Sequence, residues 1–202
     1  MSGGGYDRTI LAKRRGGLLE QLWDIEGHED MGITADAVAA KLGQEAGKTM
    51  VDTIGVGHGM PALLKHRHIE NVAGVKVSRK AEHPYANQRA RLYYKLREQF
   101  VKGTISIPND EQLIEQLADI RTYTRPDGKL IIERKEEIKA RTGESPDKAD
   151  ALMLSYADFT GVLEVEQKDD GVEEGDTMTL VQQHNADMAQ RMRDLQEEED
   201  MI

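Results

Sequence analysis

The alternation of apolar and polar residues near the start of the chain predicts a β-hairpin. A strand is expected over Tyr6–Lys13 and its returning partner over Leu18–Glu26, with Arg14–Gly17 as the turn between them. Two alternating runs joined by a short turn that contains glycine are typical of a hairpin. Apolar residues at helical spacing then predict a helix that begins at Thr34 and extends to Ala46.

The next stretch alternates between strand and helix. A short strand ends at Asp52 and leads into a Gly-rich loop, which is followed by a helix over Met60–Arg67 and a strand over Val72–Val77. Two strands separated by a crossover helix favour a parallel pair in an α/β sheet. Asp52 is therefore expected at the carboxyl end of its strand, the edge at which open α/β sheets bind ligands.

The second half of the chain is predicted to be mainly helical, with one hairpin. The hairpin signal is Asp127-Gly128 between two extended runs. The predicted elements are, in order, a helix over Asn87–Val101, an extended piece over Ile105–Pro108, a helix over Asp110–Leu117 capped by Asn109, strands over Ile120–Tyr123 and Lys129–Arg134, and a helix over Glu136–Arg141.

The clearest helix start in the chain is the segment Ser145–Leu152. Ser145 is a favourable N-cap, Pro146 suits the first helical position, and Asp147 falls in the first turn, where the helix dipole favours negative charge. Asp150 shares a face with Asp147 but is flanked by apolar residues. Two interpretations stay open at this point. Asp150 either faces solvent or enters a packed interface, where a carboxylate needs a partner such as a metal ion.

Composition narrows the class of protein. The chain contains no cysteine, so disulfides and thiolate metal sites are excluded, and any metal must be held by oxygen or imidazole ligands. No apolar run is long enough for a membrane span, and no signal peptide is recognisable. We expect an intracellular protein that does not enter a membrane.

The charges are unevenly distributed along the chain. The net charge is -10, and residues 163–202 account for all of it, with 13 acidic and 3 basic residues. Residues 62–102 instead hold 10 Lys or Arg and 3 Glu. Such a basic segment favours contact with the phosphate backbone of nucleic acid. We therefore expect a domain over residues 1–162 and an acidic tail over residues 163–202, which is either disordered or a helix that binds a partner.

Asp52 and Asp150 can form one site if the helix after Ser145 crosses the sheet near its carboxyl edge. Two carboxylates in a chain without cysteine favour a hard cation such as Mg²⁺ or Mn²⁺. Two such ions about 4 Å apart are a common arrangement for phosphodiester cleavage. The alternative is that the two residues are unrelated surface carboxylates.

Four segments, taken in order, resemble the C-terminal nuclease domain of phage large terminase subunits. They are Val51–Gly57, Asn87–Ala90, Ile105–Asp110 and Ser145–Leu152, and the resemblance covers roughly Gly3 to Thr160. It implies an α/β, ribonuclease H-like fold, shared with Holliday-junction resolvases, in which helices flank a mixed sheet. It also implies a hydrolase that cuts concatemeric double-stranded phage DNA before and after a head is filled, with two Mg²⁺ or Mn²⁺ ions held by acidic residues.

The resemblance also assigns roles to individual residues. Asp52 is similar in position to the acidic residue at the end of the family's fourth strand, and Asp150 to the last carboxylate, so both are expected to be catalytic metal ligands. Asp147 is the neighbouring alternative. Gly3–Gly5 resembles the turn after the family's first strand, so the strand that carries the first carboxylate is expected to be absent. Asp7 matches a later acidic position and is expected to assist in binding metal.

The resemblance further implies partners and alternatives. Arg79 and Lys80, in a loop after a strand, and Arg89 and Arg91, on the basic helix, are expected to contact DNA. The ATPase domain that precedes the nuclease domain in the family is expected to be absent. The implied protein partners are the portal, the small terminase subunit or a separate ATPase chain, in the cytoplasm of the host cell. A second hypothesis is a catalytically impaired module that binds DNA or the packaging machinery, and a third is an assembly protein that docks through its acidic tail.

Overall fold

The first two strands form the predicted hairpin. A computed structural model describes residues 9–25, 30–43 and 47–157 of the chain. Strand β1 (Thr9–Arg15) pairs antiparallel with β2 (Leu18–Ile25), and Gly16 turns between them with a φ of 60°. The strand ends two residues later than predicted, and residues 6–8 of the predicted strand lie outside the described residues.

The parallel pair predicted around Asp52 is confirmed. Helix α1 (Met31–Leu42) is followed by β3 (Thr49–Asp52), the short 3-10 helix η1 (Gly55–Gly59), α2 (Met60–His66) and β4 (Val72–Val75). Strand β3 pairs parallel with β4, and Asp52, the last residue of β3, lies opposite Val75. The prediction that α1 begins at Thr34 is wrong: the helix begins one turn earlier, because the Asp30 side chain accepts from the amide of Gly32. Thr34 is buried inside the helix.

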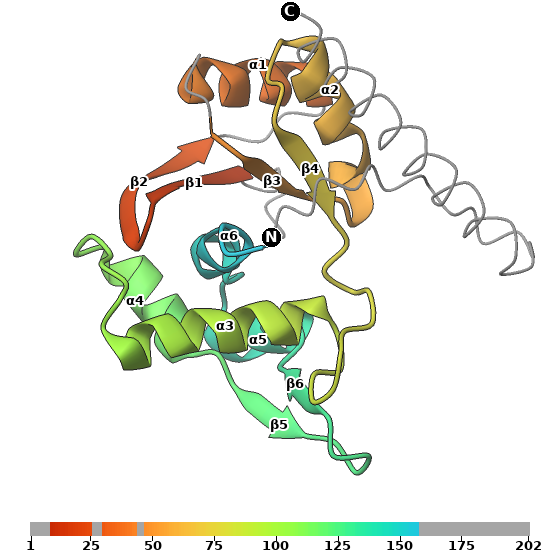
Figure 1. The fold of residues 1–202 in the computed structure, drawn as a ribbon, viewed down its shortest axis with the longest axis vertical. Coiled ribbons are helices and arrows are strands. Elements are labelled where there is room, and N and C mark those ends of the chain that lie inside the picture. Colours follow the sequence, from red (N-terminus) through yellow and green to blue (C-terminus); the bar gives the residue numbers. More distant parts are fainter. Residues whose placement is uncertain (1–8, 26–29, 44–46, 158–202) are drawn as a thin grey trace, which may run out of the picture. The chain divides into compact units, whose positions relative to one another are not determined.

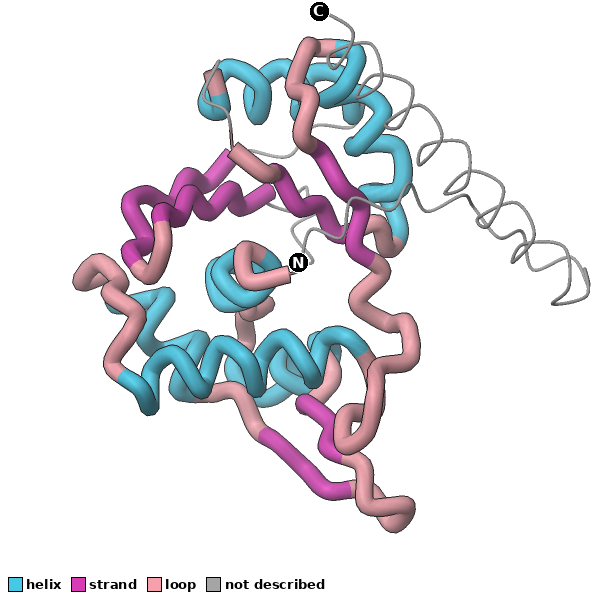
Figure 2. Tube along the Cα trace, viewed as in Figure 1, coloured by secondary structure: helices cyan, strands magenta, loops and turns pink. Residues whose placement is uncertain are grey.

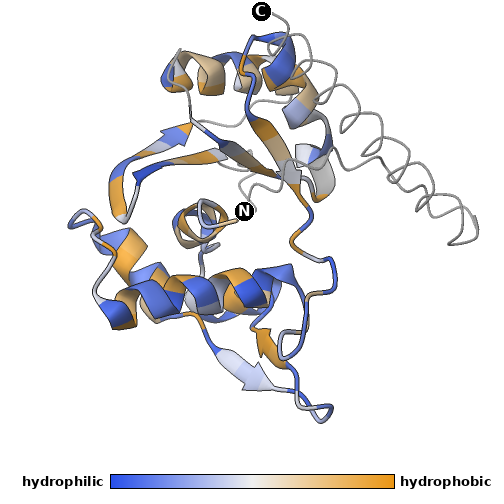
Figure 3. Cartoon of the chain, viewed as in Figure 1, coloured by the Kyte–Doolittle hydropathy of each residue, from blue (hydrophilic) through white to orange (hydrophobic). Residues whose placement is uncertain are grey.

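The remaining elements are mostly helices. They are α3 (Gln88–Lys102), α4 (Glu111–Ala118), the antiparallel strands β5 (Thr122–Thr124) and β6 (Leu130–Ile132), α5 (Lys135–Thr142) and α6 (Asp147–Leu154). The cap predicted at Asn109 is wrong by one residue, because the Asp110 carboxylate accepts from the amide of Leu113 and α4 begins after it. In Figure 3, β6 is apolar whereas β5 is pale, in keeping with the exposure of all three β5 residues.

The β1–β2 and β3–β4 pairs lie in one layer between two groups of helices (Figures 1 and 2). One apolar cluster joins β1 and β2 to β4 and to helices α3, α4 and α6, through residues such as Leu19, Leu96 and Leu152. A second cluster joins β1–β4 to α1 and α2 on the other face, through Val38, Leu64 and Val72. Among the described residues, β1 pairs only with β2 and β3 only with β4. Helix α6 lies against both β1 and β3.

The start of α6 differs from the prediction in its cap. The helix begins at Asp147, and the N-cap position is held by Pro146, whose side chain makes no capping hydrogen bond. Ser145, the predicted N-cap, instead donates its hydroxyl to Asp147 at 2.8 Å. The amides of the first turn donate to a residue of α4: Gln116 Oε1 accepts from Lys148 at 2.9 Å and from Ala149 at 3.1 Å. Helix α4 therefore supplies the cap that determines where α6 begins.

None of the described helices is both long enough and apolar enough to cross a membrane. The predicted acidic tail over residues 163–202 lies outside the described residues, as does Asp7.

Because Gln116 caps α6 from another helix, its removal is predicted to destabilise the fold. We expect Gln116→Ala to lower the free energy of unfolding by about 1 kcal/mol, the usual loss for an N-cap acceptor. Urea unfolding checks this. Gln112→Ala, one turn earlier on α4, removes an amide that donates to the exposed Glu144 and serves as the control. Gln116→Glu retains an acceptor and should recover most of the loss, whereas equal losses for Gln112→Ala and Gln116→Ala would contradict this account of the cap.

Candidate metal centre

Asp52 ends β3 beside a tight glycine loop. Its Oδ1 accepts from the amide of Ile54 at 3.1 Å, so the chain turns directly after the strand. The loop then returns to the strand end, since a Cβ on Gly57 would lie 2.0 Å from the Asp52 carbonyl oxygen. Only glycine permits so close an approach between two backbone segments. Gly57 therefore shapes the backbone beside the carboxylate.

Helix α6 packs against β3, and Asp150 lies near enough to Asp52 for the two carboxylates to influence each other. Burial raises the pKa of the Asp52 carboxyl, and the nearby Asp150 carboxylate raises it further. The Ile54 amide and the cationic side chains of Lys135 and Arg89 act in the opposite direction. Asp52 is exposed at the surface, but the surrounding protein removes part of the hydration of its carboxylate. Asp52 lies at the carboxyl edge of the parallel pair, and Asp150, on α6, lies within electrostatic reach of it.

Asp150 is held by two residues of α3. Its Oδ1 accepts from Tyr93 OH at 2.7 Å and from Arg89 Nη2 at 3.1 Å. The side chain of Asp150 is 22% exposed and that of Arg89 is 14% exposed. Arg89 also donates through Nη1 to the backbone carbonyl of Glu133 at 2.6 Å. Of the two interpretations of Asp150, the structure supports the packed, partnered carboxylate.

Asp147 is paired with a lysine that begins α5. Lys135 Nζ lies 2.7 Å from Asp147 Oδ1 and 4.0 Å from Asp150 Oδ2. Burial lowers the pKa of Lys135, but the Asp147 and Asp150 carboxylates outweigh it and hold the pKa above its ordinary value. The ammonium thus stays charged and offsets part of the negative charge of the cluster. Its side chain is 49% exposed, so it is the cation of the cluster that water reaches most easily.

The four predicted DNA-binding residues fall into two groups. Arg79 and Lys80 are exposed in the loop after β4, which is tied to the start of α3 by hydrogen bonds from Gln88 to the Arg79 carbonyl and from Arg89 to the Val77 carbonyl, both 2.9 Å. Arg89 lies inside the carboxylate cluster. Arg91 pairs with Glu82, with Nε and Oε1 2.6 Å apart. Of the four, Arg79 and Lys80 are exposed, whereas Arg89 and Arg91 are half-buried.

Two residues of the cluster were not predicted from the sequence. Tyr93 lies one helical turn after Arg89, a spacing that puts both side chains on one face of α3 and could have suggested a shared role. Lys135 had no comparable signal, because its approach to Asp147 depends on how the β5–β6 hairpin delivers α5 to α6. Long-range packing of this kind leaves no local pattern in the sequence.

The chemistry of the cluster fits a hard divalent cation. Asp52 and Asp150 offer carboxylate oxygens, and Mg²⁺ is commonly held by one or two carboxylates together with water and substrate phosphate oxygens. The described part of the chain contains no group of three or more His, Asp or Glu side chains placed to hold a metal ion. The described residues therefore fit an ion held by two carboxylates, and Asp147, whose Oδ1 contacts Lys135 and Ser145, is a neighbouring third carboxylate.

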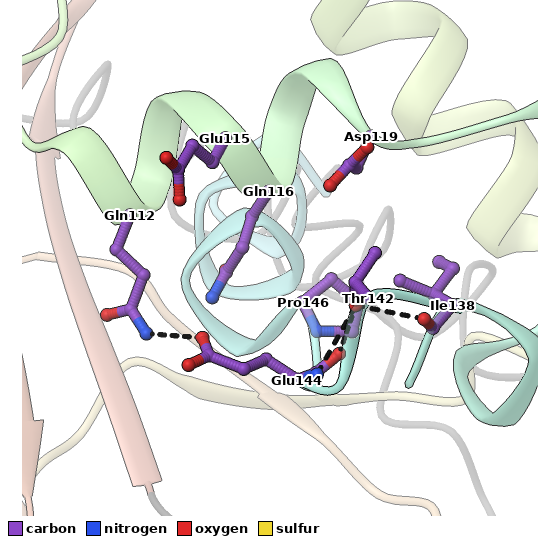
Figure 4. Close-up of a pocket in the computed structure, with 8 residues that line it drawn as sticks. All are labelled: Gln112, Glu115, Gln116, Asp119, Ile138, Thr142, Glu144 and Pro146. Atoms are coloured by element: carbon purple, nitrogen blue, oxygen red, sulfur yellow. Dashed lines mark hydrogen bonds between the residues drawn. The ribbon is translucent and has the colours of Figure 1, made fainter. Parts of the chain in front are cut away.

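A separate pocket of about 210 Å³ lies between α4 and the segment that joins α5 to α6 (Figure 4). Gln116, which caps α6, lies in its wall, and Gln112 donates across it to Glu144 at 2.9 Å. None of the predicted site residues lines this pocket. Its polar side chains therefore link α4 to the connection between α5 and α6. The candidate metal centre lies elsewhere.

No protein-family model and no curated protein matches the sequence. Solved structures do match. A mutant nuclease domain of the large terminase subunit gp2 of bacterial virus Sf6, with manganese and beta-thujaplicinol, aligns with a TM-score of 0.62 at 23% identity, over 76% of this chain and 84% of that chain. The large terminase nuclease of thermophilic phage G20c with bound magnesium has a TM-score of 0.53 at 18% identity, over 75% and 83%.

The large terminase nuclease domain of Thermus phage P74-26 has a TM-score of 0.52 at 18% identity, over 75% of this chain and 81% of that chain. The agreement extends across most of both chains in each comparison. This chain therefore has the fold of the nuclease domains of phage large terminase subunits, the α/β, ribonuclease H-like fold that the resemblance implied.

Proposed function

We propose that this chain is a metal-dependent endonuclease domain of a phage DNA-packaging terminase, which cleaves concatemeric double-stranded DNA by phosphodiester hydrolysis. The observation that supports the proposal is the packing of α6 against β3, which brings Asp150 near enough to Asp52 to influence its charge, in a fold shared with terminase nuclease domains. Neighbours with this fold hold manganese and magnesium. Asp52 and Asp150 would hold the cation here, which when bound supplies a Lewis acid beside the scissile phosphodiester.

The chain's own residues have separate parts in this proposal. Asp52 and Asp150 bind the cation, and Asp147, which contacts Lys135 through Oδ1, is the candidate third carboxylate. A second ion, as the resemblance implies, would require Asp147 or Asp7. Arg79 and Lys80 would hold the phosphate backbone of DNA at the same edge of the sheet. The predicted protein partners, which are the portal, the small terminase subunit and a separate ATPase chain, stay predictions.

A second candidate function is a catalytically impaired module that binds DNA without cleaving it. The observation in its favour is that only two carboxylates converge on the candidate centre among the described residues, while the third nearby carboxylate is paired with Lys135. The two candidates share the fold and the DNA ligand and differ only in whether the chain cleaves DNA.

Plasmid nicking tests the first candidate. We expect the protein with Mn²⁺ to convert supercoiled plasmid into nicked circles, and EDTA to stop the reaction. Asp52→Asn and Asp150→Asn should each abolish nicking, because a neutral amide is a poor ligand for a hard cation. Asp127→Asn, in the exposed turn of the β5–β6 hairpin, is the control and should retain full activity. A folded protein that nicks at no Mn²⁺ or Mg²⁺ concentration would leave the impaired module as the better description.

The salt dependence of DNA binding tests the predicted contact surface and applies to both candidates. Each phosphate contact contributes about 0.9 to the slope of log K against log salt. The double variant Arg79→Ala/Lys80→Ala should therefore bind more weakly, with a slope reduced by up to about 1.8. Lys65→Ala/Lys102→Ala removes the same charge from the ends of α2 and α3 and should change the slope less. Fluorescence anisotropy with labelled duplex DNA measures both, and equal changes would show a diffuse charge effect in place of a loop contact.

A further inference from the structure

The two oxygens of Asp150 have different surroundings. Oδ1 accepts from Tyr93 OH at 2.7 Å, from Arg89 Nη2 at 3.1 Å and from Arg89 Nε at 3.4 Å. Lys135 is the cation near Oδ2. Its Nζ lies 4.0 Å from that oxygen, beyond hydrogen-bonding distance. The lone pairs of Oδ1 are therefore occupied by donors from α3, whereas Oδ2 accepts no hydrogen bond from the described residues.

The donors on Oδ1 are fixed in place. Tyr93 is buried, with 6% of its surface exposed, and lies one turn from Arg89 on the same helix. The Arg89 guanidinium lies 5.1 Å from the centre of the Tyr93 ring and is anchored a second time by the Glu133 carbonyl. Neither donor can leave Asp150 without placing an unpaired polar group inside the protein, which is costly. The exposed Lys135, in contrast, can exchange its partner for water.

We propose that Arg89 and Tyr93 are positioning residues that occupy Oδ1 of Asp150, so that Asp150 binds a divalent cation through Oδ2 alone. This inference rests on the proposed function, because it assumes that Asp150 is a metal ligand. Its consequence is selectivity. Ca²⁺ accepts six to eight oxygens and often takes both oxygens of one carboxylate, whereas Mg²⁺ requires a near-octahedral set of single oxygens. A carboxylate restricted to one oxygen favours the smaller ions, Mg²⁺ and Mn²⁺, over Ca²⁺.

A purely structural role for the same contacts has a different consequence. If Arg89 and Tyr93 only neutralise a half-buried carboxylate, removing one of them weakens the fold and lowers the affinity of every divalent ion by a similar factor. If they restrict Asp150 to one oxygen, removing the hydroxyl takes away the shortest hydrogen bond to Oδ1 and leaves only the longer Arg89 contacts, so that Oδ1 becomes more available and the losses for Mn²⁺ and Ca²⁺ become unequal. The ratio of the two affinities separates the two roles.

The experiment is calorimetric titration of the protein with Mn²⁺ and with Ca²⁺, without DNA. For Tyr93→Phe, we expect the Mn²⁺ affinity to fall by about tenfold, the lower end of the range for outer-shell partners of a metal ligand, and the Ca²⁺ affinity to fall much less. Tyr94→Phe is the matched control: the neighbouring tyrosine on α3 packs against the ring of Tyr85, with centroids 5.6 Å apart. It should leave both affinities unchanged. Arg89→Lys, which retains the charge but loses the second contact with Oδ1, should change the ratio in the same direction if Tyr93→Phe does not fold.

The outcomes separate this inference from the proposed function. If the unmodified protein binds neither ion, or if Asp150→Asn leaves binding unchanged, the metal centre itself is wrong and the inference is overturned with it. If Asp150→Asn abolishes binding while Tyr93→Phe and Arg89→Lys retain the original Mn²⁺ to Ca²⁺ ratio, the metal centre stands and only the positioning role is overturned.

Discussion

The pairing of Asp150 is the interaction on which the rest of the site depends. A carboxylate that is largely removed from water is costly unless charged or hydrogen-bonding groups compensate for it. Here α3 supplies those groups, and the same Arg89 guanidinium reaches the backbone at Glu133, just before α5. One side chain therefore fixes α6, α3 and the junction between β6 and α5 with respect to one another. Removing one partner from such a pair typically costs about 3–5 kcal/mol, so the arrangement is strongly constrained.

The same constraint divides the cations of the site into two kinds. Arg89 is only 14% exposed and serves two acceptors, so its contact with Asp150 belongs to the folded structure. Lys135 is half-exposed and contacts Asp147 closely but Asp150 only at 4.0 Å. A divalent ion arriving at Asp52 and Asp150 would therefore compete with Lys135 and leave Arg89 in place. Before an ion binds, Lys135 offsets part of the repulsion between the carboxylates; an incoming ion must compete with it, which weakens ion binding.

Local signals in the sequence predicted the elements that hold the two carboxylates, but not the contacts that orient them. The strand that ends at Asp52, its parallel partner and the helix that begins after Asn87 were all predicted, because apolar spacing and capping residues are local properties. The cap of α6 was assigned to Ser145, which is adjacent in sequence, whereas Gln116 on α4 provides it. Lys135 and Tyr93 were not predicted for the same physical reason. Tertiary packing decides which side chains make such contacts, and no single segment of the sequence contains that information.

The number of carboxylates decides how many ions the described residues can hold. Asp52 and Asp150 supply one oxygen each if Oδ1 of Asp150 is occupied by α3 and Oδ1 of Asp52 keeps its bond to Ile54. Two such oxygens suit one Mg²⁺ or Mn²⁺ ion that completes its coordination with water and with phosphate oxygens of the substrate. A second ion needs further oxygens, and Asp147 is a candidate source, since its contacts with Lys135 and Ser145 both use Oδ1. In this arrangement the substrate phosphate would contribute to the metal centre as well as react at it, so ion binding and DNA binding should strengthen each other.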